Sequence, residues 1–253
     1  MWLCCRREQA NLFADRYQQF VHEVGVRVST TARTESAHRD SRSDRGICAA
    51  YFETPRGQTR GDLVGRAGQE LRLKSGARGR DLLWVSARID LGVGIDYPQP
   101  ETIGADRLAN AAAVTTLYGF PAIVVDFGTA VTFDIVSEKK RYIGGVIAPG
   151  LESMTNFLYQ RTALLPKLSL KEPRSAVGKS TAGAMMAGAI YGYRGLVREI
   201  LERIRSERFP RQRVKVVATG GYAQLIGRQM REIQSVHPNL TLEGLRIVAA
   251  LNS

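Results

Sequence analysis

The amino-acid composition of this chain changes abruptly near Leu82, and the change limits which part can build an ordered core. From Leu82 onward, short Val- and Ile-rich runs alternate with Ala- and Leu-rich segments of helical spacing. Before Leu82, Arg, Ser, Gly and Asp dominate, and only residues 10–24 and 47–52 have the periodicity of a helix and of a strand. Strands that alternate with helices predict an α/β protein.

Hydrophobic periodicity and turn residues define the expected elements of the later part. Strands are predicted over residues 122–125, 131–136, 142–147 and 214–218, after a short apolar run at 82–85. Helices are predicted over residues 105–118, 151–159, 181–193, 196–208 and 224–233. Residues 55–80 are rich in Gly and Arg with few apolar side chains, which favours a loop or disorder.

Composition excludes several classes of protein. Hydrophobic residues make up 44% of the chain and charged residues 24%, as in ordinary globular proteins. No run approaches the roughly 18 apolar residues of a membrane helix, and the start lacks the apolar segment of a signal peptide. Three cysteines cannot form a disulfide framework and lack metal-ligand spacing. We therefore expect a cytoplasmic protein without a membrane partner.

The net charge of +12 indicates an anionic partner, either a nucleic acid or a phosphorylated small molecule. The basic residues are spread along the whole chain, which favours general solubility over a docking face. Aromatic residues make up only 8% and hardly interleave with the Arg- and Gly-rich stretch, so bases have no stacking platform. A nucleic-acid partner is therefore not expected.

Asp126 is the first candidate site residue, because it ends a buried strand and is followed by Gly128 and Thr129 in a turn. A carboxylate, backbone N–H groups and a hydroxyl at one point suit a polyphosphate with its cation. A plain hairpin turn, with Asp126 capping its own backbone, explains the same residues.

Three further motifs each have a functional and a structural explanation. Asp106, in the run 104–111, is either a chemical group or an ordinary acid of a first helical turn. Gly220 and Gly221, between a strand and a helix, let the backbone approach a nucleotide or simply form a turn. Glycines 144 and 145 within a strand indicate close backbone approach or a bulge.

Taken together and in this order, these motifs resemble the type III pantothenate kinases of the acetate and sugar kinase/actin-like superfamily. The resemblance runs from about Trp84 to the C-terminus, about two thirds of the chain. It rests on Asp96-Tyr97, Gly104-Ala105-Asp106-Arg107, Asp126-Phe127-Gly128-Thr129, residues 144–150, Thr181 at the start of an Ala/Gly helix, residues 218–221 and residues 240–245.

The resemblance implies a fold of two ribonuclease H-like halves of the actin-like/sugar kinase type, with the first half degenerate or incomplete here. The expected division is residues 1–118, of which 1–83 are atypical, and residues 119–253. It also implies ATP-dependent phosphorylation of pantothenate to 4'-phosphopantothenate, the first step of coenzyme A biosynthesis, by a homodimer.

Matching positions carry the roles that the resemblance implies. Asp106 resembles the general base, and Asp126 matches the position that binds a monovalent cation, potassium or ammonium. Mg with ATP completes the expected cofactors. The pantothenate pocket is expected to involve Tyr97, Gly104, Ala105, Asp106, Arg107 and Thr181, and the nucleotide site Thr129, Gly220 and Gly221.

The chain departs from the family at its start. The family has a phosphate loop of the form Asp-Xaa-Gly-Asn-Thr within its first dozen residues, whereas residues 1–20 here contain no Gly and Asp15 is followed by Arg16. Two explanations are open, a frame error in a GC-rich gene, which we favour, and a divergent N-terminus. The alternatives to a kinase are therefore a non-catalytic homologue that acts as a sensor or regulator, or an inactive frame-damaged product.

Overall fold

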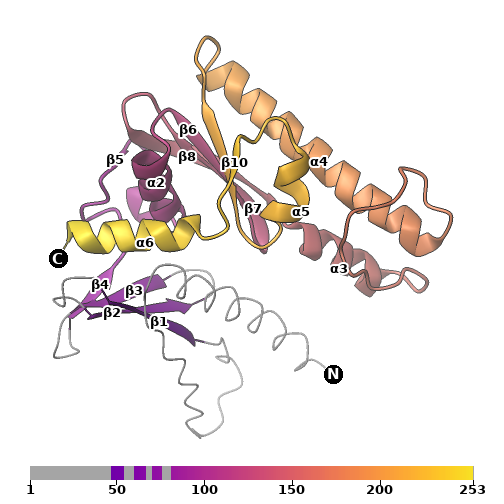
Figure 1. Ribbon diagram of the computed structural model, residues 1–253, viewed down its shortest axis with the longest axis horizontal. Helices are drawn as coiled ribbons and strands as arrows, with labels where there is room; N and C mark the ends of the chain where they lie inside the picture. Colours follow the sequence, from indigo (N-terminus) through magenta and orange to yellow (C-terminus); the bar gives the residue numbers. More distant parts are fainter. Residues whose placement is uncertain (1–46, 54–59, 67–69, 76–80, 253) are drawn as a thin grey trace, which may run out of the picture.

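The computed structural model describes residues 47–53, 60–66, 70–75 and 81–252, with side chains from Leu83 onward. The helix predicted at 10–24, the missing phosphate loop and the frame question lie outside the described residues. Figure 1 shows two sheets, one formed by the earlier strands and one by the later part of the chain.

Four early strands form an antiparallel sheet in chain order, namely β1 (Ile47–Glu53), β2 (Arg60–Arg66), β3 (Glu70–Ser75) and β4 (Asp81–Trp84). The strand predicted at 47–52 is confirmed. The loop or disorder predicted for 55–80 is wrong where β2 and β3 form. Residues 70–75 read Glu-Leu-Arg-Leu-Lys-Ser, and this alternation with a period of two is a strand pattern that the Arg-rich composition obscures.

The second sheet has six strands in the order β10-β9-β6-β7-β8-β5. Strands β6, β7 and β8 are antiparallel neighbours, β9 and β10 run parallel to β6, and β5 runs parallel to β8. This mixed sheet confirms the α/β class. The bounds are β5 Gly94–Ile95, β6 Ala122–Phe127, β7 Ala130–Val136, β8 Arg141–Pro149, β9 Lys215–Thr219 and β10 Ser235–Val236.

Successive residues of a strand point to opposite faces of the sheet, and apolar side chains emerge on both faces here. Helices therefore cover both faces. On β6, Val124 packs with helices α2 and α6, while Ile123 and Val125 pack with helix α4 (Figure 1). The helices are α2 (Ala105–Leu117), α3 (Leu151–Arg161), α4 (Thr181–Arg208), α5 (Ala223–Ile226) and α6 (Leu240–Leu251), with single 3-10 turns at Pro100–Thr102 and Gly227–Gln229. None of the described helices is both long and apolar enough to cross a bilayer.

Two helix predictions are wrong in detail. The segments 181–193 and 196–208 form one helix, because Tyr193 and Val197 are buried on either side of Gly195 and carry the helix through it. The helix predicted over 224–233 ends as α5 and a 3-10 turn, after which the chain forms β10 beside β9. At this turn Gly227 packs on Ala218, and a Cβ there would lie 3.1 Å from the Ala218 side chain.

The contact between α2 and α6 is unusually close. Gly244 of α6 lies directly on the backbone of Ala109, and a Cβ at position 244 would overlap the Ala109 carbonyl. Nine of the 13 residues of α2 are buried. This helix is therefore clamped between the sheet and α6, which fixes the position of its N-terminal residues.

Candidate active site

The N-terminal turn of α2 carries Asp106 and Arg107. Gly104 is the N-cap residue and offers no side chain, whereas the exposed Asp106 accepts a hydrogen bond from the backbone N–H of Arg107 at 2.9 Å. A carboxylate in a first helical turn is favoured by the helix dipole. The ordinary structural role of Asp106 is thus present, and its exposure leaves it open to a substrate.

Arg107 turns back toward the sheet and pairs with a buried carboxylate. Its Nε lies 2.7 Å from Oδ1 of Asp134, which is fully buried on β7. The Tyr142 hydroxyl donates to the same oxygen at 3.5 Å, and the guanidinium lies 5.7 Å from the Tyr142 ring centre. Burial raises the pKa of Asp134 to about 7, against the opposing charge of Arg107. The buried Nη2 of Arg107 has no partner among the described residues.

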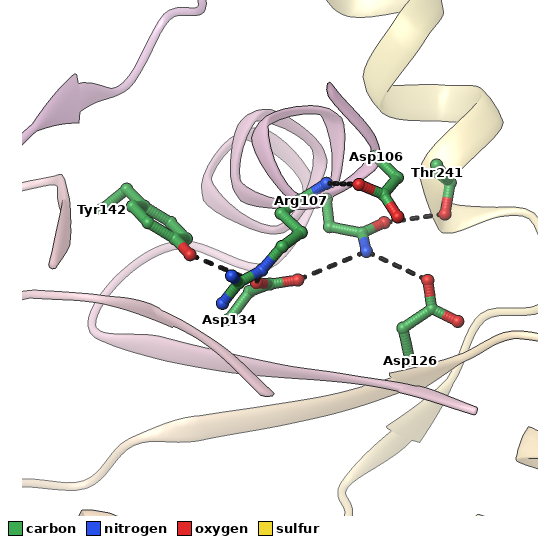
Figure 2. A network of polar contacts seen from close by, with 7 residues as sticks. Asp106, Arg107, Asp126, Asp134, Tyr142 and Thr241 are labelled. Atoms are coloured by element: carbon green, nitrogen blue, oxygen red, sulfur yellow. Dashed lines mark hydrogen bonds and ion pairs between the residues drawn. The ribbon is translucent and has the colours of Figure 1, made fainter. Parts of the chain in front are cut away.

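The fully buried side chain of Asn110 joins this ion pair to Asp126 (Figure 2). Its Nδ2 donates to Asp126 at 3.3 Å and to Asp134 at 3.5 Å, and its Oδ1 accepts from the Thr241 hydroxyl of α6 at 2.7 Å. One amide therefore links two strands and two helices. The charge of Asp106 also acts on both carboxylates and disfavours their ionisation.

Asp126 does not cap its own turn, which was the structural alternative. The turn is closed by the Gly128 N–H, which donates to the Ala130 carbonyl at 3.0 Å, while the Asp126 carboxylate bonds to Asn110. Burial raises the pKa of Asp126 to about 6, with the Asn110 hydrogen bond opposing the shift. A partly buried carboxylate of this kind gains from a cation beside it.

Gly220 approaches Asp126 in a way that only glycine permits. Its φ of +89° lies in the left-handed region, and a Cβ would overlap Oδ1 of Asp126. Tyr222, two residues after Gly220, donates its backbone N–H to the Phe127 carbonyl at 3.2 Å. The Gly220-Gly221 turn and the Phe127–Thr129 turn therefore lie side by side, with Thr129 exposed.

Tyr97 joins the same region through Tyr142. The two rings meet edge to face with centres 6.2 Å apart. Gly144 is beside Tyr97 with a φ of +121°, at an irregular register of β7 and β8, and a Cβ at Gly145 would overlap the Phe133 carbonyl and Nη2 of Arg107. Both the bulge and the close approach predicted for these glycines are confirmed.

Thr181 is not brought to this network within one chain. It begins α4, where Ser180 caps the helix by accepting from the Gly183 N–H at 3.1 Å, and it is exposed. Figure 1 shows this end of α4 beyond α3, on the opposite side of the molecule from α2. The other site residues named above, including Gly104 and Ala105, belong to or adjoin the network.

Sequence reasoning missed four members of the network, namely Asn110, Asp134, Tyr142 and Thr241. Asn110 carried a usable signal, because it interrupts an Ala- and Leu-rich run three and four residues after Arg107 and Asp106 and so shares their helix face. Asp134 likewise interrupts an apolar strand. The remaining two had no distinctive pattern.

Asp126 is the acidic side chain that lies where the Phe127–Thr129 turn meets the Gly220-Gly221 turn. No group of three or more His, Cys, Asp or Glu side chains able to hold a metal occurs in the described part of the chain. Asp126 offers one carboxylate. No side chain separates this carboxylate from the backbone of the adjoining Gly220-Gly221 turn. Hard cations prefer oxygen ligands, which this carboxylate supplies.

The family model and the curated relatives that match this chain carry the same description. The family model of type III pantothenate kinase matches residues 61–203. A type III pantothenate kinase of Akkermansia muciniphila is 57% identical over 162 residues, 64% of this chain and 66% of the relative. That of Moorella thermoacetica is 47% identical over 175 residues, 69% of this chain and 68% of the relative.

These matches cover only part of each protein, since the chain spans about two thirds of the length of the curated relatives it matches. Among solved structures, a Campylobacter jejuni protein described as a Baf family transcriptional activator is 21% identical. The matched region spans 64% of this chain and 70% of the Campylobacter chain, and the TM-score is 0.44. That structural likeness is too weak to support an argument about function.

Proposed function

Because the chain belongs to the type III pantothenate kinase family, we propose that it transfers the terminal phosphoryl group of ATP to the primary hydroxyl of pantothenate. The product is 4'-phosphopantothenate, and the step begins coenzyme A biosynthesis. The observation that carries the proposal is the Asn110-centred network, in which Asp106 and Arg107 of α2 are coupled to Asp126 of β6.

Asp106 is proposed as the general base. It is exposed at the N-terminus of a helix that is otherwise buried, so its carboxylate can accept the hydroxyl proton while its backbone stays fixed. Phosphoryl transfer depends on in-line positioning and charge stabilisation more than on covalent help from the protein. A positioned carboxylate contributes on the order of 10²- to 10⁴-fold to such a reaction.

Arg107 is proposed to hold the substrate beside this base, together with Gly104, Ala105 and Tyr97. The unpartnered Nη2 of Arg107 supports this role, because a buried N–H without an acceptor is costly and a substrate carboxylate or hydroxyl would satisfy it. Tyr97 lies over the Tyr142 ring that contacts the same guanidinium.

Thr129, Gly220 and Gly221 are proposed to contact ATP, which carries Mg as its counter-ion. Asp126 is proposed to hold a monovalent cation, potassium or ammonium, next to these turns. When bound, that cation would supply positive charge near the phosphates. The raised pKa of Asp126 supports a cation partner, because burial without one disfavours the charged carboxylate.

The strand order supports the finer fold proposal. Five strands of the second sheet lie in the order β8-β7-β6-β9-β10. Strands β6, β7 and β8 form an antiparallel meander, and β9 and β10 run parallel to β6 on its other side. This order is expected for a ribonuclease H-like half of the actin-like/sugar kinase type. The division at residues 118 and 119, and a first half that is degenerate or incomplete, remain part of this proposal, as does a cytoplasmic location.

A homodimer is proposed as the working form, and two observations support it. Apolar side chains on β8 and α3 are exposed, namely Ile147 at 62%, Phe157 at 58%, Met154 and Leu158. Thr181 is distant from Asp106 within one chain, so a second copy would be needed to bring it to the pocket. Light scattering of the wild type and of Phe157→Ser tests this, with a monomeric wild type as the contrary result.

A non-catalytic sensor is the second candidate, favoured by the absence of an Asp-Xaa-Gly-Asn-Thr run in residues 1–20. A coupled assay of ADP release with pantothenate, Mg and K separates the two functions. Pantothenate-dependent turnover that is lost in Asp106→Asn would support the kinase. Pantothenate binding by calorimetry without turnover would support the sensor, and neither activity nor binding would indicate a damaged reading frame.

A further inference from the structure

The first turn of α3 contacts both of the turns that we assign to the nucleotide. Helix α3 begins directly after β8, and its N-cap residue Gly150 donates its N–H to the Thr129 carbonyl at 3.1 Å. The Ser153 hydroxyl donates to the same carbonyl at 2.8 Å. A Cβ at Gly150 would overlap the Thr129 carbonyl, so the helix end and the turn are in direct contact.

The neighbouring residue of the same helical turn holds the other loop. The Tyr222 hydroxyl donates to Oε2 of Glu152 at 2.8 Å, and Tyr222 directly follows Gly220 and Gly221. Burial raises the pKa of Tyr222, and the Glu152 carboxylate adds to the shift, so this hydroxyl keeps its proton and remains a donor. The backbone N–H of Tyr222 bonds in turn to the Phe127 carbonyl.

These contacts form a bracket, which we define as Glu152, Ser153 and Tyr222. Ser153 acts on the Thr129 turn, Tyr222 belongs to the glycine turn, and Glu152 joins the two through one helical turn. Each of the three turns is short and has an exposed residue, namely Thr129, Gly221 and Ser153, so their mutual spacing depends on such cross-links. Phosphate groups held between two turns are sensitive to that spacing, because misplacement by about 1 Å costs orders of magnitude in transfer rate.

We propose that Glu152 and Tyr222 are positioning residues for the nucleotide, acting through the Gly220-Gly221 and Thr129 turns without touching the reacting atoms. The inference rests on the proposed function for the identity of the ligand. It predicts that breaking the Glu152–Tyr222 hydrogen bond weakens nucleotide binding while leaving the pantothenate pocket around Arg107 intact.

The test uses the full chain and the variants Tyr222→Phe, Glu152→Ala and Glu152→Gln. Binding of the magnesium complex of a non-hydrolysable ATP analogue (AMP-PNP) is measured by calorimetry, and KM for ATP and for pantothenate by the coupled assay. Tyr222→Phe and Glu152→Ala are expected to raise the analogue Kd about tenfold, which is the loss of one hydrogen bond to a charged acceptor. KM for pantothenate is expected to change less than about twofold. Glu152→Gln keeps an acceptor oxygen and is expected to stay within about threefold of wild type.

Tyr118→Phe is the matched control, because it removes another half-buried tyrosine hydroxyl, bonded to His237 at 3.0 Å, at the far end of α2. Unchanged analogue binding in both Tyr222→Phe and Glu152→Ala would overturn the inference, and so would an equal rise in both KM values. If the wild type binds the analogue but does not phosphorylate pantothenate, the proposed function fails. The calorimetric titrations of the variants with the analogue then still test the positioning role of Glu152 and Tyr222. A wild type that binds no nucleotide overturns both.

Discussion

Replacing Asn110 with alanine tests whether one buried amide holds the proposed site together. The substitution removes the donor for Asp126 and Asp134 and the acceptor for Thr241. The two bonds to carboxylates are long, 3.3 and 3.5 Å, so each is worth about 1 kcal/mol and not the larger value of a short charged bond. The Thr241 bond, at 2.7 Å, adds about 1 kcal/mol.

The expected loss for Asn110→Ala is therefore about 3 kcal/mol, or about 6–12 °C in Tm for a chain of this size. Thr241→Val removes only the hydroxyl and should cost about 1 kcal/mol. In the double variant, the two changes should be non-additive by about 1 kcal/mol, which is the coupling of the shared bond. Urea and thermal unfolding of the four proteins supply these values.

Thr116→Val is the control for this cycle, because Thr116 is exposed on the same helix and its hydroxyl donates to the Ala112 carbonyl of that helix. It is expected to combine additively with Asn110→Ala. The reasoning is refuted if Asn110→Ala costs less than about 0.5 kcal/mol, a cost typical of a surface substitution, or if Thr116→Val couples to it as strongly as Thr241→Val does.

Three further outcomes are expected. Asp106→Asn should lower kcat by about 10²- to 10⁴-fold with little change in Tm, because the side chain is exposed; a variant with wild-type turnover in the coupled assay would exclude Asp106 as the base. The folded state holds a proton on Asp126 more tightly than the unfolded state, since its pKa is about 6 against an ordinary 3.8, so this group's contribution to stability is present below about pH 4 and is lost as the pH rises through 6. In potassium-free buffer, the unfolding free energy of Asp126→Asn should therefore rise by about 2 kcal/mol relative to that of wild type between pH 4 and pH 7, and a constant difference in unfolding free energy would contradict the sign. Gly244→Ala should destabilise the protein by about 1–3 kcal/mol through overlap with the Ala109 carbonyl, whereas Gly192→Ala, whose Cβ would meet nothing within 4 Å on an exposed helix face, should stabilise it by about 0.5–1 kcal/mol; equal melting temperatures would argue against the close α2–α6 contact.

The central sheet was predictable because its strands are short apolar runs bounded by turn residues, as at Ala122–Phe127. The hairpin turn and the glycine turn were also predictable as motifs, and so was the position of Asp126 near the end of a buried strand. The contact of Gly220 with Asp126 was not, because it depends on β9 lying parallel to β6, almost a hundred residues apart in the chain.

Other differences arise where local composition and tertiary structure disagree. The helix α4 passes through Gly192 and Gly195 because buried neighbours such as Tyr193 and Val197 anchor it, and tertiary packing overrides helix propensity. Asn110 and Asp134 act only as a pair with residues from distant segments, so neither stands out alone. The position of Thr181, far from Asp106, follows from the length and direction of α4 and from no local pattern.

The burial of α2 has a consequence for hydrogen exchange. With nine of 13 residues buried between the sheet and α6, the central amides of this helix can meet solvent only when α6 detaches or the sheet itself opens. The central amides of the helix that carries Asp106 should thus be among the last to exchange deuterium, while the amide of the exposed Ser153 in the first turn of α3 should exchange early. The proposed base and the proposed nucleotide bracket therefore belong to different opening units of the same protein.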